Sequence, residues 1–235
     1  MTKREFETVG IIAAMKVEAD GIKAKIESAK CETVSGIEFV FGKLGKKTVV
    51  VAQCGVGKVF AALCTEAMIL RYSPDCIINT GVAGALDPEL SILDIVVADH
   101  VVQHDMDTSA LGDPVGMISG INMIGIPADS RICSALCEGV RATGAKVLSG
   151  TVASGDQFIG DSETKAKIHS VFGAASCEME GAAVGHVCYV NGVPFGVIRA
   201  ISDGGDDDAK MDFPTFAAKA AEISTAAVLE FLSRI

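Results

Sequence analysis

Short apolar runs alternate with stretches of helical periodicity along this chain, and this alternation limits the folds open to it. Continuous apolar runs are typical of strands buried on both faces, as in a parallel sheet. We expect strands at residues 9–15, 37–44, 47–52, 76–80, 95–102, 146–153, 174–179 and 195–202. We expect helices at residues 17–29, 59–72, 129–143, 162–171, 181–189 and 213–233, with Asp129 as an N-cap. The pattern predicts an α/β fold, a three-layer sandwich whose mixed, mostly parallel sheet is flanked by helices.

The composition favours one domain with a large apolar core. No linker rich in proline, serine or charge divides the 235 residues, so we expect a single domain over residues 1–235. The mean hydropathy of +0.41 is high, yet no uncharged apolar stretch approaches the ~18 residues that a membrane span needs. We expect no membrane partner, and an excess of apolar residues in the core and in a subunit interface. Residues 1–5 carry charges in place of an apolar signal region, which predicts a cytoplasmic location.

Charge and ligand patterns exclude two classes of partner. A formal net charge of −10 argues against nucleic acid, which needs clustered Lys and Arg. His100 and His104 have no cysteine or third histidine nearby, so we predict no metal site and no cofactor.

The cysteines form no Cys-x-x-Cys pair, and we expect buried, reduced thiols in the core segments that contain Cys54, Cys64, Cys76, Cys177 and Cys188.

Three acidic residues follow three of the predicted strands: Glu18, Glu180 and Asp203. Ligands of parallel α/β sheets bind in the crevice outside the carboxyl ends of the strands. Any one of these residues, taken alone, could be a helix cap or a structural partner. Three carboxyl groups at three strand ends together predict an acid/base site.

Two glycine segments also follow strands and are expected to be loops, at residues 55–58 and 81–84. Glycine lets the backbone approach a sugar or a phosphate closely, although tight turns between strands and helices use glycine equally often. The first segment is not a Walker A loop, because Val59 stands where serine or threonine is required.

Six ordered motifs carry a resemblance to a known family. They are residues 10–15 followed by Glu18, and then residues 55–58, 79–84, 154–159, 178–180 and 199–203. Together they span nearly the whole chain, which resembles the 5′-methylthioadenosine/S-adenosylhomocysteine nucleosidases of the purine nucleoside phosphorylase-like fold. The resemblance implies hydrolysis of the N-glycosidic bond of methylthioadenosine and adenosylhomocysteine, and also of 5′-deoxyadenosine. The products would be adenine and the thioribose, in methionine salvage and methyl-cycle recycling.

The resemblance also implies roles for individual residues. Glu18 would deprotonate water with Arg199 close by, Glu180 would hold the ribose hydroxyls, and Asp203 would protonate adenine N7. Substrate-binding positions implied in the same way are Met15, Val56, Val82, Ala83, Gly84, Phe158, Ile159, Glu178, Met179, Ser202 and Phe213. The chain departs from the family pattern at Val82, where many members carry a serine or threonine whose hydroxyl can help to hold the water or the sugar.

The chemistry of the reaction agrees with these roles. Cleavage creates an oxocarbenium-like sugar and an electron-rich purine, so an anion beside the sugar and an acid beside the base both stabilise the transition state. We expect an apolar, water-poor pocket that raises the pKa of Asp203 and keeps it protonated with substrate bound.

Several alternatives stay open at this point. A phosphorylase of the same fold would need Arg or Lys donors for phosphate, and the glycine segments offer only Lys58. An AMP nucleosidase would need cations for a 5′-phosphate, and a silent nucleoside-binding protein should lack one of the three acids. A 6-amino-6-deoxyfutalosine nucleosidase is not separated from the main prediction by sequence.

The long loop expected at residues 108–128 predicts a homodimer. Its segment 117–126 is uncharged and strongly apolar, and an isolated monomer should not expose such a stretch. The resemblance implies that this segment caps the 5′-alkylthio pocket of the partner, alongside Met15 and Phe213.

Overall fold

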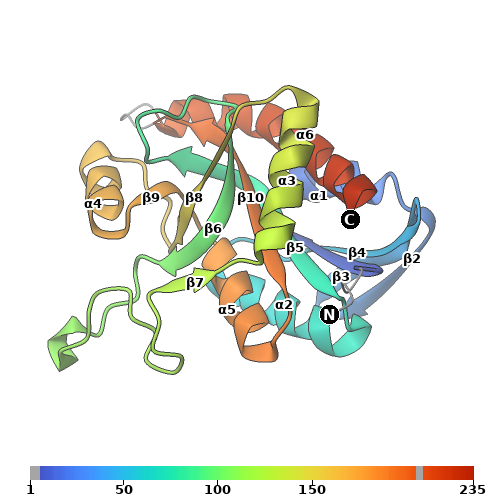
Figure 1. Cartoon of the computed structure of the whole chain (residues 1–235), viewed down its shortest axis with the longest axis horizontal. Helices are drawn as coiled ribbons and strands as arrows, with labels where there is room; N and C mark the ends of the chain where they lie inside the picture. Colours follow the sequence, from blue (N-terminus) through green and yellow to red (C-terminus); the bar gives the residue numbers. More distant parts are fainter. Residues whose placement is uncertain (1–5, 205–208) are drawn as a thin grey trace.

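A mixed sheet with helices on both of its faces forms the centre of the molecule (Figure 1). The computed structural model describes residues 6–204 and 209–235, and for residues 209–215 it describes the backbone alone. The elements in chain order are β1 (Thr8–Ala13), α1 (Lys16–Lys23), β2 (Glu27–Val34), β3 (Ile37–Leu44), β4 (Lys47–Gln53), α2 (Lys58–Tyr72), β5 (Cys76–Ala85), β6 (Ile95–Gln103), η1 (Ser109–Leu111), β7 (Gly125–Pro127), α3 (Ser130–Thr143), β8 (Val147–Ser154), α4 (Ser162–Phe172), β9 (Ala174–Glu178), α5 (Gly181–Asn191), β10 (Phe195–Asp203) and α6 (Ala209–Arg234).

The strand order combines a closed part with an open part. It runs β10-β6-β8-β9-β5-β1-β4-β3-β2, and β10 also pairs with β5, so the strands from β10 to β5 form a ring. The pairs of β1 with β4 and β5, of β5 with β10, and of β8 with β6 and β9 are parallel. Strands β1, β4, β3 and β2 extend from β5 as an open sheet, and β7 pairs with β6. The predicted α/β class is confirmed, whereas the ring was not predicted.

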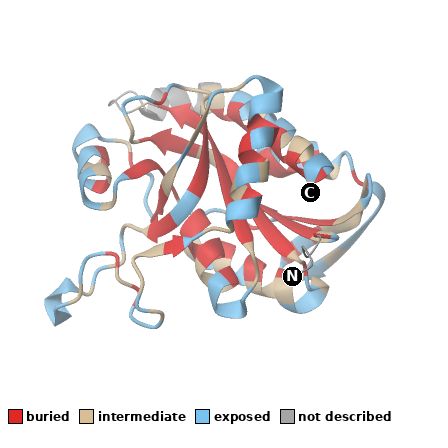
Figure 2. Ribbon diagram, in the orientation of Figure 1, coloured by how far each residue is buried: buried red, intermediate tan, exposed pale blue. Residues whose placement is uncertain are grey.

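Helices cover the sheet from two sides and bury its apolar runs. One face carries α1, α3 and α6, whose buried side chains include Ile22, Leu136 and Phe231. The other face carries α2 and α5, with Met68 and Val184 in its core. Figure 2 shows the central strands buried between these layers, while the outer sides of the helices are exposed. Strands buried on both faces explain why the sequence reads as continuous apolar runs.

The predicted boundaries hold for most elements, and the largest difference in a helix lies near the N-terminus. The Asp129 carboxylate accepts hydrogen bonds from the backbone N–H groups of Arg131 and Ile132, which confirms the predicted N-cap of α3. The helix predicted over residues 17–29 ends at Lys23, and β2 begins at Glu27. Most side chains of β2 are exposed and polar, so its sequence lacks the alternation of apolar and polar residues that is typical of a strand. The strand is defined by its pairing with β3.

The long segment after β6 is mostly irregular, as predicted, but it contains η1 and the short strand β7. β7 pairs with β6, which places Ile126 in the core. In the part of the chain that the structure describes, no helix combines the length and the apolar character needed to cross a membrane.

Candidate active site

A cavity of about 320 Å³ lies where β1, β5, β9 and β10 meet the helices α1 and α5. Glu18, Glu180 and Asp203 all line it, although they are far apart in the sequence. Each is almost fully buried. The structure therefore brings the three predicted acids together around one cavity.

Glu18 is fixed by backbone donors from two elements. It lies in the first turn of α1, and its Oε2 accepts a hydrogen bond from the Met15 N–H at 2.8 Å. Its Oε1 accepts one from the Val82 N–H of β5 at 3.1 Å. Burial raises the pKa of the Glu18 carboxyl above its usual value, while these donors and the charge of Arg199 act in the opposite direction. At Val82 it is therefore the backbone, and no side-chain hydroxyl, that contacts this acid.

The prediction that residues 81–84 form a loop is wrong, because these residues belong to the second half of β5. Its glycines are needed because carboxylates lie against the strand. A Cβ added at Gly81 would lie 2.8 Å from Oε1 of Glu18, and one at Gly84 would lie 2.7 Å from Oδ2 of Asp203. Glycine in a strand interior often marks such a close approach.

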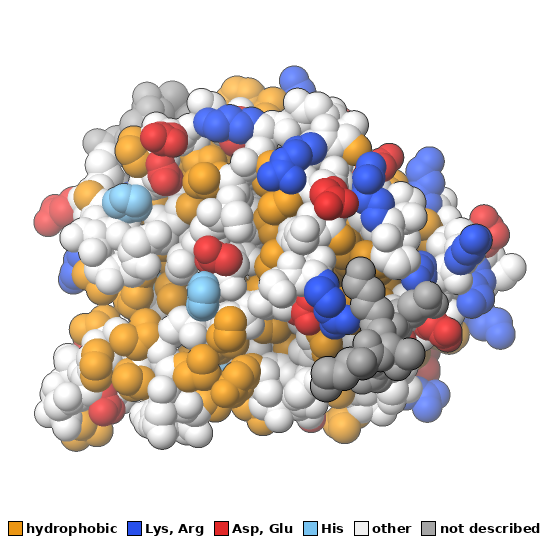
Figure 3. Space-filling view, viewed as in Figure 1, with side chains coloured by type: hydrophobic (Ala, Val, Ile, Leu, Met, Phe, Trp, Pro, Cys, Tyr) orange, Lys and Arg blue, Asp and Glu red, His pale blue; other side chains and the backbone are white. Residues whose placement is uncertain are grey.

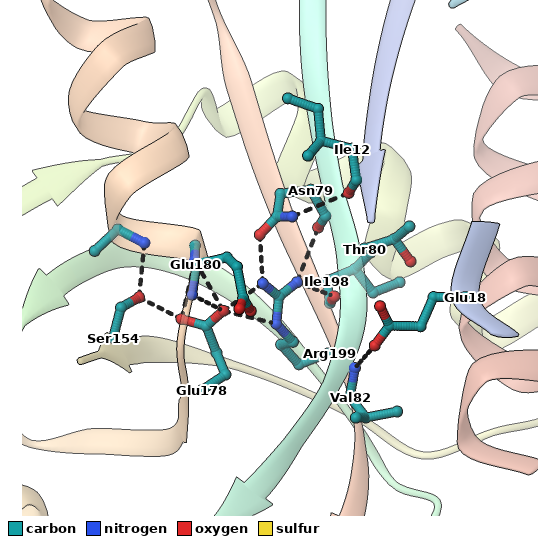
Figure 4. Close-up of polar contacts among 12 residues, drawn as sticks. Ile12, Glu18, Asn79, Thr80, Val82, Ser154, Glu178, Glu180, Ile198 and Arg199 are labelled. Carbon is teal, nitrogen blue, oxygen red and sulfur yellow. Dashed lines mark hydrogen bonds and ion pairs between the residues drawn. The ribbon is translucent and has the colours of Figure 1, made fainter. Parts of the chain in front are cut away.

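A buried network around Arg199 holds Glu178 in place (Figure 4). Arg199 donates to Glu178 Oε2 through Nε at 3.2 Å and through Nη2, and it donates through Nη1 to the backbone carbonyls of Asn79 and Ile198 at 3.1 and 2.9 Å. The Ser154 hydroxyl also donates to Glu178. Arg199 is not among the residues that line the cavity; it lies behind Glu178 and orients the Glu178 carboxylate.

The two glutamates of the segment 178–180 have opposite pKa shifts. Burial, and then the charge of Glu178, raises the pKa of Glu180 to about 7, although the Gly57 N–H donates to its Oε1 at 2.7 Å. Burial opposes ionisation of Glu178 as well, but the charge of Arg199 and the hydrogen bonds from Ser154 and Arg199 outweigh it and lower its pKa. Glu178 is thus the anion of a structural ion pair, while Glu180 gains and loses its proton near neutral pH.

Asp203 ends β10 and forms an ion pair with a lysine that the sequence did not single out. Lys165 Nζ of α4 lies 3.0 Å from Asp203 Oδ2, and both side chains are 3% exposed. The Ser202 hydroxyl donates to Asp203 Oδ1 at 3.1 Å. An ammonium group thus lies beside the Asp203 carboxyl, in addition to the apolar pocket expected around it.

Comparison with known proteins agrees with this site. The family model of the Phosphorylase superfamily matches residues 8–233. The 5′-methylthioadenosine/S-adenosylhomocysteine nucleosidases of Shewanella halifaxensis and Shewanella sediminis are each 39% identical to this chain, over 97% of it and 99% of their own length. The chain belongs to this nucleosidase family of the Phosphorylase superfamily.

Solved structures of the family have the same fold. The nucleosidase of Neisseria meningitidis in complex with methylthio-immucillin-A has a TM-score of 0.94 and 33% identity, and the match covers 97% of this chain and 100% of that one. The futalosine hydrolase of Helicobacter pylori has a TM-score of 0.93 and 34% identity, and the match covers 98% of this chain and 99% of that one.

Most substrate-binding positions implied by the family resemblance line the cavity: Met15, Val56, Val82, Ala83, Gly84, Phe158, Glu178, Met179 and Ser202. Ile159 lines an adjoining space of about 30 Å³ that shares Phe158 and Asp203 with the main cavity. Phe213 belongs to α6, but its side chain lies outside the described residues.

Sequence reasoning missed Cys177 in the cavity lining and Lys165 behind Asp203. One signal was present for Lys165, because it lies three residues before the buried Ile168 and so shares a face of α4 with it.

Proposed function

We propose that this protein hydrolyses the N-glycosidic bond of 5′-methylthioadenosine and S-adenosylhomocysteine, releasing adenine and the thioribose. The observation that carries the proposal is the convergence of Glu18, Glu180 and Asp203 on one cavity. Curated relatives at 39% identity are named for these two substrates. The reaction serves methionine salvage and the recycling of the methyl cycle, and 5′-deoxyadenosine is a further substrate of the same shape.

Glu18 is suited to the role of general base. Its two oxygens are aimed by the Met15 and Val82 N–H groups, so the carboxylate has a fixed orientation. Its raised pKa strengthens it as a proton acceptor, because a carboxylate in a buried site binds a proton more readily. In the proposed reaction Glu18 takes a proton from water as the water attacks C1′ of the ribose.

Glu180 and Asp203 are suited to the two parts of the nucleoside. Glu180 accepts hydrogen bonds from the ribose hydroxyls, beside Met179, and its charge stabilises the cationic sugar of the transition state. Asp203 lies at the base end, where its carboxyl donates to adenine N7 and accepts from the 6-amino group. Phe158 stacks on the base, and the backbone of Ile159 reads the edge of the base. A 6-oxo purine would present an acceptor where this carboxyl also accepts.

The contacts of the cationic groups favour hydrolysis over phosphorolysis. Lys58 Nζ is bound to Asp105 at 2.6 Å, and its backbone N–H donates to Asp156 at 2.8 Å. The Gly57 N–H, which could otherwise bind phosphate, donates to Glu180. Arg71 forms a surface ion pair with Glu32. Lys58, Gly57 and Arg71, which could otherwise bind a phosphate nucleophile, thus already bind carboxylates of the chain itself.

We expect the purified protein to release adenine from methylthioadenosine in buffer that contains no phosphate. The measurement is the quantity of adenine and of free methylthioribose by chromatography, with and without added phosphate. A requirement for phosphate together with formation of a ribose 1-phosphate would overturn the hydrolase proposal. Comparison of kcat/KM for methylthioadenosine and 6-amino-6-deoxyfutalosine tests the alternative substrate.

Exposed apolar residues beside the cavity support the homodimer part of the proposal. Val59, Phe60 and Leu63 are 77%, 53% and 43% exposed, and their spacing puts them on one face of α2. Val56 lines the cavity and lies two residues before the start of this helix, so a second copy of the chain on this face would also cover the cavity mouth. Figure 3 shows further hydrophobic side chains at the lower left, where the loop with η1 and β7 lies in Figure 1.

The prediction that the segment 117–126 lies in the subunit interface is wrong for part of this segment. Ile118 and Ile126 of the segment 117–126 are buried in the core of their own chain, and Ile124 packs partly against another core cluster. β7 pairs with β6, so Ile126 has no exposed side chain to offer a partner.

We expect the double substitution Phe60→Asp, Leu63→Asp to give monomers and to lower kcat/KM for methylthioadenosine by about tenfold or more, because two carboxylates in an apolar interface are costly to desolvate. Light scattering after size-exclusion chromatography reports the mass. Val171→Asp on α4, also an exposed apolar residue, is the matched control. Monomers with full kcat/KM would contradict the proposal that the second copy of the chain covers the cavity.

A further inference from the structure

Lys58, Asp105 and Asp156 form a bridging cluster beside the cavity, and the proposed reaction gives these residues no role of their own. Lys58 begins α2, while Asp105 and Asp156 come two residues after the ends of β6 and β8. Asp156 Oδ1 accepts a hydrogen bond from the Lys58 N–H at 2.8 Å, and the Asp156 N–H donates to Asp105 Oδ2 at 2.9 Å. Lys58 Nζ donates to Asp105 Oδ1 at 2.6 Å. Each residue of the bridging cluster therefore contacts the other two.

The Asp156 carboxylate takes the place of an N-cap side chain for α2. The N-cap of this helix is Gly57, which has no side chain to accept hydrogen bonds from the first turn. Gly57 has a φ of +101°, which favours glycine, and a Cβ added there would lie 3.2 Å from Asp156 Oδ1. The helix dipole also favours an anion at this end. The start of α2 is thus completed by a residue 98 positions further along the chain than Lys58.

The ion pair between Lys58 and Asp105 supports this contact. The two side chains are 18% and 25% exposed, so water screens them only in part. Lys58 Nζ also donates to Gln103 Oε1 of β6 at 3.2 Å. Partial burial opposes ionisation of Asp105, but the hydrogen bonds from Lys58 and from the Asp156 N–H outweigh it and lower the pKa of Asp105. The ionised Asp105 accepts from both residues at once and holds them in a fixed relation.

The segments that the bridging cluster joins carry parts of the proposed substrate site. In the segment 55–58, the Gly57 N–H donates to Glu180 Oε1 at 2.7 Å. In the segment 155–159, Phe158 lines the cavity. The two segments follow β4 and β8, and the strands β9, β5 and β1 lie between β4 and β8 in the sheet. Among the described strands, sheet pairing does not join these two segments directly, whereas the bridging cluster does.

We propose that Asp156 is a positioning residue, which Lys58 and Asp105 hold in place so that the base site at Phe158 and the ribose site at Glu180 bind one nucleoside together. This inference rests on the proposed nucleosidase function and deepens it. Asp156 is not among the described residues that line the cavity, so it acts through the two segments and not by contact with the substrate.

The physical reason lies in the cost of ordering the site. A nucleoside gains its base contacts and its ribose contacts together only where the two segments already have the right separation. Without the bridging cluster, part of the binding free energy is spent on ordering the segments, which lowers the affinity. A misplacement of about 1 Å far from the chemistry can cost about 10²-fold in rate. We therefore expect a loss of the bridging cluster to weaken both binding and catalysis.

Two substitutions at Asp156 test this role. Asp156→Asn keeps an oxygen that accepts from the Lys58 N–H, whereas Asp156→Ala removes the acceptor. We expect Asp156→Ala to lower kcat/KM for methylthioadenosine by about 10–10²-fold and to weaken adenine binding by about tenfold. Asp156→Asn should stay within about threefold of the wild type in both quantities. Steady-state kinetics give kcat/KM, and calorimetric titration gives the Kd of adenine.

Asp129→Ala is the matched control. It removes the carboxylate that caps α3, and no described residue of α3 lines the cavity. Because each alanine variant loses a helix cap, thermal melting should show similar losses of stability. Only Asp156→Ala should lose kcat/KM and adenine affinity. Equal losses in Asp129→Ala would assign the effect to stability alone and would overturn the inference.

Double variants test whether Asp156 acts through its neighbours. In a Phe158→Ala background, Asp156→Ala should weaken adenine binding by less than about threefold further, because its effect on the base passes through this ring. Asp156→Ala should also lower kcat/KM less in an Asp105→Ala background than in the wild type, because both residues belong to one network.

Additive losses in either double variant, equal losses for Asp156→Asn and Asp156→Ala, or an Asp156→Ala variant within about threefold of the wild type would overturn the inference. Absence of adenine release by the wild-type protein would instead overturn the proposed function.

Discussion

Asp203→Asn is expected to lower kcat for methylthioadenosine by about 10²–10⁴-fold while changing KM little, because an amide can bind N7 but cannot pass a proton to it. The side chain stays beside Ser202 and Gly84, so the shape of the base site is preserved. Steady-state kinetics give kcat, and calorimetric titration with adenine checks that binding survives. A kcat close to that of the wild type would remove Asp203 from the role of acid.

The structure adds a stability effect to this variant. Removal of one partner of a buried ion pair typically costs about 3–5 kcal/mol, and Asp203→Asn leaves the Lys165 ammonium buried without its carboxylate. The double variant Asp203→Asn, Lys165→Met removes both charges. We expect it to recover much of the free energy of unfolding in denaturant titrations but none of the activity. Recovery of activity along with stability would mean that the single variant was merely misfolded.

Glu18→Gln is expected to lower kcat by a similar factor of about 10²–10⁴ for a different reason: an amide cannot accept a proton from water. The two oxygens of Glu18 accept hydrogen bonds from Met15 and Val82, so the amide nitrogen of glutamine would face one of these donors. Some loss of orientation accompanies the loss of basicity.

Two measurements separate these effects of Glu18→Gln. Glu18→Ala with added formate supplies a small carboxylate to the vacated space, and partial recovery of adenine release would identify proton acceptance as the missing function. Glu27→Gln, on the exposed strand β2, is the matched control and should keep wild-type kcat. Wild-type kcat in Glu18→Gln itself would exclude Glu18 as the base.

The α/β class was predictable because it depends on short-range pattern. Strands such as β1 and β10 are buried on both faces, so they consist of continuous apolar runs, and helices between them have their own periodicity. β2 was missed because its side chains are mostly exposed and polar, and only hydrogen bonds from β3 define it. The closure of β10 onto β5 is equally invisible in local sequence, since it joins residues more than a hundred positions apart.

In the candidate site too, some features were predictable from local sequence and others depended on tertiary contacts. Its acids could be located because each follows an apolar run, and the family motifs around them are contiguous. The glycine segment 81–84 was assigned to the site as a loop, but it is part of a strand. Its glycines leave room for the carboxylates of Glu18 and Asp203 beside the strand. The apolar segment 117–126 was assigned to a partner, although β7 buries Ile126 in its own chain.

The sequence by itself determined which residue types line the cavity and from which strand ends they come. Only the tertiary structure decided which carboxyl groups are paired and which can exchange a proton. Glu178 and Arg199, and Lys165 and Asp203, meet across gaps of 21 and 38 residues, while Glu180, two positions from Glu178, has a pKa of about 7. The reason is physical: charge–charge energies and desolvation depend on distance and burial in space, and neither is encoded in the spacing of residues along a strand.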